Sequence, residues 1–407
     1  MFGDWCREHC ALYLPAMKLN RLSATHMPAL DGVRGIAILT VMIHHMTVFV
    51  PETEAQRFFF AVTSGGWIGV ELFFVLSGML ITGILLDSRD EPFYFRNFYA
   101  RRVLRIFPLY YLLLVVSFYV LPLFPHPKIA NFSRVMGDEV WYWLFLSNFS
   151  SAVAGGPRHG IMDVTWSLAI EEQFYHVWPM IVLACGRRRL AQIATTLFCT
   201  SVLCRLLATW FEVSPWTIYV VTPTRLDGLC CGALLAIALR GDPARFPHLL
   251  KGAWWALLGG LLVTCLIALR EGGLIWDRPL VQTLGFAVFA IMFAGLIGVA
   301  VLSRDSQNAI DRALRARWLV NFGLYSYALY LFHLPVRAFV RDVVLKPGRF
   351  ADFPGGILVA QTLFYLLSTG IALVLAWISF RLFESRFLKL KPRFEARVMQ
   401  RPVVGLP

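Results

Sequence analysis

GGWIGVELFFVLSGMLITGILL, residues 65–86, is an apolar run with one charged side chain, that of Glu71. A helix needs about 20 mostly apolar residues to cross the hydrocarbon core of a bilayer. Runs of this kind recur along the whole chain of 407 residues, of which 58% are hydrophobic and 15% are charged. Because a soluble protein of this size needs far more polar surface, the sequence predicts a membrane protein.

Ten segments are apolar enough to be predicted as spanning helices, and no stretch has the composition of a separate soluble domain. They cover about residues 33–50, 66–86, 106–124, 165–186, 190–211, 225–239, 253–270, 281–303, 319–340 and 356–380. We therefore expect an all-α, polytopic membrane helix bundle of about ten transmembrane helices. The expected organisation is a tail over 1–27, a transmembrane domain over 28–390 and a second tail over 391–407.

The chain carries a formal net charge of +13, which by itself could suggest a nucleic-acid partner. Most of the lysines and arginines, however, fall in the segments on one side of the predicted bundle. This asymmetry fits the positive-inside rule and predicts that both tails are cytoplasmic. We therefore interpret the positive charge as a sign of membrane topology, and we expect no nucleic-acid partner. The eight cysteines show no Cys-x-x-Cys spacing, and we expect no metal site.

The first predicted span, LDGVRGIAILTVMIHHM at residues 30–46, carries Arg34 and His45 eleven residues apart. Eleven residues come within about 20° of whole helical turns, so the two side chains share one face about 16 Å apart. His44 is rotated about 80° away. Ionisable groups inside a membrane usually mark function. The alternatives are a snorkelling anchor for Arg34 and a helix–helix hydrogen bond for His45.

Other ionisable side chains are expected in the outer half of the bundle or at its outer edge, near the depth of His45. They come from four further predicted spans: Glu71, Glu171, Glu172, Arg225 and His333. A hydrogen bond from the His45 imidazole to the Glu71 carboxylate would fix the imidazole tautomer. Glu172 could instead form a structural pair with His176, four residues later, and Arg225 could be interfacial.

Arginines gather at the inner face, in FYFRNFYARRVLRIFP. Arg101, Arg102 and Arg105 are spaced i,i+3 and i,i+4, so they project from one side of a helix start. Guanidinium groups bind phosphates through paired hydrogen bonds, which favours a cytoplasmic phosphate ligand. The alternative is a role in topology and in binding lipid headgroups.

Taken together, these stretches resemble the acyltransferase-3 family of integral membrane O-acyltransferases over about residues 28–390. Arg34 and His45 fit the family's Arg/Lys-x10-His signature. Its other blocks look like GWIGVELFFVLSGMLIT, FYARRVLRIFP, WSLAIEEQFY, TRLDGLCCGALL, YSYALYLFHLP and LFESRF, in this order. Two positions depart from the family: Glu71 stands where Asp is more usual, and Leu334 where Trp is common.

The resemblance implies a multi-pass enzyme of the bacterial inner membrane. It would move an acyl group, expected to be acetyl, from acyl-coenzyme A to a sugar hydroxyl of a surface polysaccharide, lipopolysaccharide, peptidoglycan or glycolipid. It implies that His45 is catalytic, with Glu71 in support.

The resemblance also assigns two donor-binding residues, and our own interpretation of the sequence adds the others. Arg102 and Arg105 match the Arg-x2-Arg pair that the family is proposed to use for coenzyme A phosphates, and we expect Arg34 and Arg101 beside them. Glu171, Glu172, His333 and Arg225 are expected to shape the acceptor side.

A transporter or flippase is the alternative class, because the same intramembrane acids and histidines could relay protons or substrate. Binding of acetyl-coenzyme A, and its loss on Arg102→Ala and Arg105→Ala, would separate the two classes.

Overall fold

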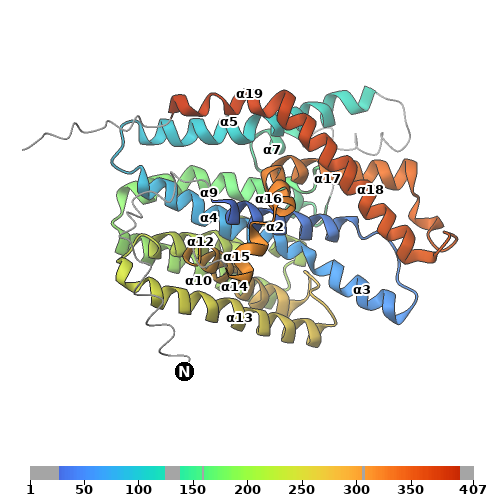
Figure 1. Cartoon of the computed structure of the whole chain (residues 1–407), viewed down its shortest axis with the longest axis horizontal. Helices are drawn as coiled ribbons and strands as arrows, with labels where there is room; N and C mark the ends of the chain where they lie inside the picture. The colour runs from blue at the N-terminus through green and yellow to red at the C-terminus, as the bar shows by residue number, and fades with distance from the viewer. Residues whose placement is uncertain (1–26, 124–137, 158–159, 305–307, 395–407) are drawn as a thin grey trace, which may run out of the picture.

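The computed structural model describes residues 27–123, 138–157, 160–304 and 308–394 (Figure 1). Within these ranges the regular elements are all helices, which confirms the predicted all-α membrane class. Apart from Met27, the predicted N-terminal tail lies outside the described residues, as does most of the C-terminal tail.

Each predicted span coincides with helix. Nine correspond to α2 (Pro28–Met46), α4 (Gly69–Asp87), α5 (Tyr94–Val115), α9 (Thr165–Ala184), α10 (Arg187–Trp210), α12 (Leu226–Ala238), α13 (Phe246–Glu271), α14 (Phe286–Leu302) and α18 (Gly356–Ser379). The segment 319–340 is broken at Tyr325 into α16 (Arg317–Leu324) and α17 (Ser326–Phe339).

Six helical stretches of the described chain are long and apolar enough to cross a membrane by length and composition. The number of ten spans and the cytoplasmic placement of the termini stay predictions.

Shorter helices fill the connections: α3 (Glu54–Ser64), α7 (Glu139–Trp143), α8 (Ser147–Val153), α11 (Pro215–Val220), α15 (Ala309–Leu314) and α19 (Ser385–Leu388). The segment that carries α7 and α8 folds back onto the bundle. Tyr110 in α5 donates a hydrogen bond to the Tyr142 carbonyl at 2.8 Å, and Asn148 donates to the Val220 carbonyl at 3.3 Å. This segment therefore forms part of the bundle wall.

In Figure 1, α5 and α13 lie at opposite edges of the bundle, with α2 and α4 between them. The helices around α2 and α4 approach through glycines. A Cβ at Gly32 of α2 would lie 1.9 Å from the Leu314 carbonyl oxygen, and one at Gly78 of α4 would lie 1.9 Å from that of Leu229. Only glycine permits such contact between helix backbones. This packing fixes the helix that carries His45.

Candidate active site

His45, in the last turn of α2, lies beside His333 of α17. Nε2 of His333 is 3.2 Å from Nδ1 of His45, and the ring centroids are 5.0 Å apart. Nδ1 of His333 lies 2.7 Å from the Tyr330 carbonyl oxygen and 3.2 Å from that of Leu329. The structure therefore brings together two residues that the sequence placed at one depth.

These contacts assign the tautomers of the two neutral rings. A carbonyl oxygen only accepts, so Nδ1 of His333 carries the hydrogen and its Nε2 is an acceptor. Nδ1 of His45, which also lies 3.1 Å from the Val41 carbonyl oxygen, is then the donor. Nε2 of His45 keeps its lone pair, and no described residue hydrogen bonds to it. This is the form that a general base requires.

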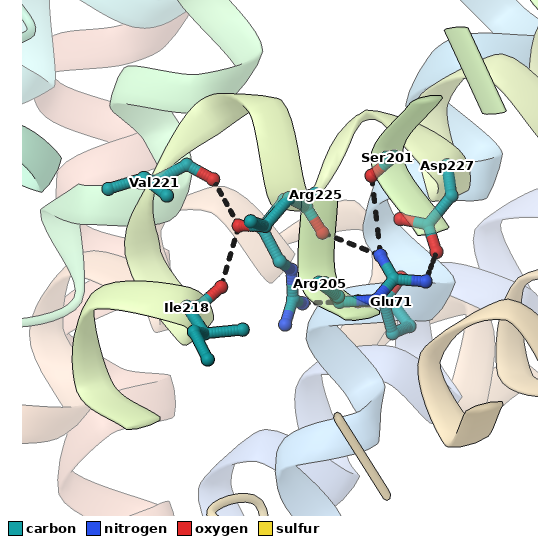
Figure 2. Close-up of polar contacts among 8 residues, drawn as sticks. Glu71, Ser201, Arg205, Ile218, Val221, Arg225 and Asp227 are labelled. Carbon is teal, nitrogen blue, oxygen red and sulfur yellow. Dashed lines mark hydrogen bonds and ion pairs between the residues drawn. The ribbon is translucent and has the colours of Figure 1, made fainter. Parts of the chain in front are cut away.

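The expected hydrogen bond between Glu71 and His45 is not among the contacts of the described residues. Oε1 of Glu71 instead accepts from Nη2 of Arg225 (Figure 2), and Oε2 lies against Gly228, whose Cβ would be 2.9 Å away. The Glu71 side chain thus points toward Arg225 and α12. His333 therefore occupies the place beside His45 that we expected for Glu71.

Arg225 and Glu71 belong to a buried cluster of four charges with Arg205 and Asp227, shown in Figure 2. All four side chains are 0% exposed, and Nη2 of Arg205 lies 2.7 Å from Oδ2 of Asp227. Nη1 of Arg205 donates to the Thr224 carbonyl at 2.6 Å. Arg225 is therefore buried inside the bundle. Its place near the end of a predicted span had allowed the alternative that it lies at the membrane interface.

The Arg225 guanidinium packs against aromatic rings, 4.2 Å from the Phe286 centroid and 4.9 Å from that of Tyr219. Tyr219 and Trp166, whose centroid is 5.5 Å from the same guanidinium, line a cavity that Arg225 itself does not line. The sequence assigned Arg225 to the acceptor side. The structure places it behind the aromatic wall of this cavity, where it packs against the rings.

This cavity has a volume of about 260 Å³ and is lined by both His44 and His45. Its aromatic wall is continuous: ring centroids are 4.8 Å apart for Trp166 and Tyr219 and 5.3 Å apart for Tyr219 and Trp276. Polar groups reach it from several elements: Asp163, Tyr330, Arg337 and Arg341. The cavity is therefore apolar on one wall and polar around the histidines.

His44 also faces this cavity, although helical geometry predicted that its side chain points in a different direction from that of His45. Its Nδ1 lies 2.7 Å from the Ser64 carbonyl oxygen, and the two rings meet edge to face at 4.9 Å. The cavity is wide enough to reach both faces of the last turn of α2. Unlike His45, His44 has no second imidazole hydrogen-bonded to its Nδ1 among the described residues.

From their predicted depth we expected Glu171 and Glu172 to lie around His45, but the structure does not place them there. Glu171 lies close to Ser77 and Tyr175 in the interior of the bundle, and both Glu171 and Glu172 interact electrostatically with Arg102. The reason is that α5 begins at Tyr94, so Arg102 is already about 12 Å along this helix. The acids and this arginine therefore meet inside the bundle.

The possible ion pair between Glu172 and His176 is absent, because Nδ1 of His176 lies 2.6 Å from the backbone oxygen of Glu172. Oε1 of Glu172 is buried and has no hydrogen-bond partner among the described residues. The nearest basic side chain that interacts with this carboxylate is that of Arg102 in α5.

The inner arginines have few acidic partners. Nη1 of Arg34 lies 2.6 Å from Oδ1 of Asp31, Nε of Arg101 donates to the Asn97 carbonyl at 3.0 Å, and Arg105 lies 3.7 Å from Glu384.

Sequence reasoning missed Lys391, which lies after α19 in the segment Lys391–Phe394 (η11). It is close enough to interact electrostatically with Arg34, Arg101, Arg102 and Arg105. The basic run KLKPRF was a visible signal, but we assigned its residues from Lys391 onward to the C-terminal tail. We call these five cations the basic cluster.

The chain matches known proteins over most of its length. The sequence profile described as "Acyltransferase domain" matches residues 27–381. YrhL of Bacillus subtilis is 32% identical over 76% of this chain and 48% of its own length. The peptidoglycan O-acetyltransferase OatA of Listeria monocytogenes is 29% identical over 78% of this chain and 50% of its own. The O-acetyltransferase OatA of Staphylococcus aureus is 27% identical over 90% and 58%.

The chain spans about half the length of these relatives. No solved structure matches it. The profile covers the helices that carry the histidine pair, the cavity and the arginines of α2 and α5. The resemblance seen in the sequence is thereby confirmed, and the chain belongs to the acyltransferase-3 family of membrane acyltransferase domains.

Proposed function

We propose that this protein is an O-acyltransferase of a bacterial inner membrane that moves an acetyl group from acetyl-coenzyme A to a sugar hydroxyl of a surface glycan or glycolipid. The observation that carries this proposal is the state of His45. Its Nδ1 is engaged by His333 and by the Val41 carbonyl, and its ring lines an aromatic cavity.

The basic cluster supports the donor half of the proposal. Coenzyme A carries several phosphate groups, and guanidinium groups bind phosphates through paired, charge-assisted hydrogen bonds. Arg102 and Arg105 carry this role, with Arg34, Arg101 and Lys391 adding positive charge around them. Nε of Arg102 is buried without a partner among the described residues, so it has a donor to offer.

The aromatic wall supports the acceptor half. The apolar face of a sugar ring packs well against the rings of Trp166, Tyr219 and Trp276, while its hydroxyls need polar partners nearby. One of the relatives above is named as a peptidoglycan O-acetyltransferase. Peptidoglycan sugars are therefore the first acceptors to test.

In the proposed reaction, the acceptor oxygen attacks the thioester carbonyl carbon while its proton passes to Nε2 of His45. The C–S bond breaks, and the leaving thiolate of coenzyme A takes up that proton. The imidazolium that forms in between donates from Nδ1 to Nε2 of His333, which holds the ring in place. Transfer of the acetyl group to His45 before it reaches the acceptor is the covalent variant.

The test is acetyl transfer by purified protein in lipid nanodiscs, with a radiolabelled acetyl group on coenzyme A and peptidoglycan fragments as acceptors. We expect labelled glycan with the wild type and none with His45→Ala protein that still inserts and runs as a single species. Transfer that persists in His45→Ala would overturn the assignment. Absence of acetyl-coenzyme A binding to the wild type would favour the transporter class.

A further inference from the structure

One face of α17 points three basic side chains toward the cavity region. His333, Arg337 and Arg341 follow one another at intervals of four residues, the last lying in Val340–Val344 (η8). Residues four apart stack on one side of a helix. Arg337 and Arg341 both line the cavity with His45. The row therefore leads outward from the histidine pair along the cavity wall.

The two arginines differ in their partners. Arg341 is occupied, because its Nε and Nη2 each lie 2.9 Å from a carboxylate oxygen of Asp342. Arg337 forms no hydrogen bond and no ion pair with any described residue, and its Nε is buried. A buried donor without an acceptor costs about 1–3 kcal/mol, and more when it is charged. Arg337 is thus a cation at the cavity with no hydrogen-bond or ion-pair partner among the described residues; Asp342, whose carboxylate Arg341 holds, is near enough to interact with it electrostatically.

Arg337 also lies near the reacting groups. It is close enough to His44, His45 and His333 to interact electrostatically with all three. Asp163, the other charged residue of the described lining, has contacts of its own, and Asp342 is held by Arg341. A ligand in the cavity would therefore meet the guanidinium of Arg337 beside the histidine pair.

We propose that Arg337 binds an anionic group, a carboxylate or a phosphate, on the acceptor, so that the site selects acidic sugars over neutral ones. This inference rests on the proposed function and adds the charge of the acceptor to it. The cavity, at about 260 Å³, is slightly smaller than the roughly 300–1,000 Å³ of pockets for drug-sized ligands. It suits a monosaccharide-sized part of the acceptor, so the anion lies on the reacting sugar or directly beside it.

The test compares acceptors that differ only in charge. Methyl N-acetyl-β-glucosaminide is used as its 3-O-carboxymethyl ether, its 3-O-phosphate and the neutral 3-O-carbamoylmethyl ether, which keeps the shape of the first. With the wild type, we expect at least one anionic glycoside to have a KM about 10- to 100-fold below that of the neutral ether. The better of the two anions identifies the group that the site takes.

Arg337→Gln is expected to raise the KM of the anionic glycoside to that of the neutral ether, with the KM of the neutral ether unchanged. Arg337→Lys should keep part of the preference, because it keeps charge but loses the paired hydrogen bonds. Arg341→Gln is the matched control and should change the preference little, since Asp342 already holds that guanidinium.

Two results would overturn the inference. One is an equal KM for charged and neutral glycosides in the wild type. The other is a fall of kcat in Arg337→Gln that is the same for both, which would assign the guanidinium to the reaction itself.

Calorimetric binding of the same glycosides to His45→Ala protein separates this inference from the proposed function. Charge-selective binding that Arg337→Gln removes supports the role of Arg337 even where no transfer occurs. Acetyl transfer without charge selectivity would support the proposed function and argue against the role of Arg337 in binding an anionic group.

Discussion

Nε2 of His333 lies 3.2 Å from Nδ1 of His45, across the contact between α17 and α2, and the two residues are 288 positions apart in the chain. The backbone carbonyls of Leu329 and Tyr330 orient the ring of His333, and the ring of His333 orients that of His45. In the proposed reaction, His333 would perform the task that a carboxylate performs in many catalytic triads, without placing a negative charge in the apolar interior.

The first prediction concerns the two adjacent histidines of α2. His45→Ala should lower acetyl transfer at least a hundredfold, because it removes the proposed base. His44→Ala should cost much less, although both rings line the cavity, because His44 has only the Ser64 carbonyl behind it. Initial rates at saturating acetyl-coenzyme A measure both. Equal losses would show that the choice between the two histidines is wrong.

The second prediction concerns His333 as a positioning residue. His333→Ala should lower kcat on the order of tenfold to a hundredfold and leave the KM for acetyl-coenzyme A unchanged, since the acceptor for Nδ1 of His45 is lost. His333→Gln should restore part of kcat, because its amide oxygen can accept the same hydrogen bond. Absence of rescue by glutamine, with folding intact, would argue against this role.

The third prediction concerns the buried ion pair of Glu71 and Arg225. Arg225→Met alone should destabilise the protein by about 3–5 kcal/mol, because it leaves a buried carboxylate without its partner. The double variant with Glu71→Leu should recover much of that loss, since apolar side chains can replace a buried pair. Unfolding in detergent measures both.

The exposed pair of Glu54 and Arg57 serves as the control for that experiment. Its removal should change stability little, because solvent screens exposed charges. If Arg225→Met is as mild as the removal of this surface pair, the buried cluster does not stabilise the aromatic wall.

The fourth prediction concerns Lys391. Lys391→Gln should weaken acetyl-coenzyme A binding by about tenfold and reduce the dependence of binding on salt, because one charge of the basic cluster is lost. Lys389→Gln is the matched control, since Lys389 is exposed and lies two residues earlier. Equal effects of the two substitutions would mean that Lys391 acts only through the net charge of the segment.

The sequence was most informative about helices and depth. Apolar runs predicted where every long helix lies, and the count of residues from a span end placed His45 and His333 at one level. The same count did not bring Glu171 and Glu172 to His45, although α9 begins at Thr165 as predicted; both acids lie close to Arg102 of α5 instead.

The rotation of each helix about its axis and the identity of its neighbouring helices could not be predicted from the hydropathy pattern. Both faces of a membrane helix are apolar, so hydropathy does not distinguish the face that meets protein from the face that meets lipid. Glu71 therefore turned out to face Arg225, and Arg225 to lie behind the cavity wall.

The sequence by itself determined a helical membrane protein, its family and the helix that carries His45. It did so because hydrophobic length and residue spacing along one chain are local properties. Only the tertiary structure decided that His333 lies against His45, that Lys391 lies near the arginines of α2 and α5, and that Arg337 lines the cavity without a hydrogen bond or ion pair among the described residues. Those relationships depend on how glycine contacts such as that of Gly78 with Leu229 set helices against one another, which no single segment encodes.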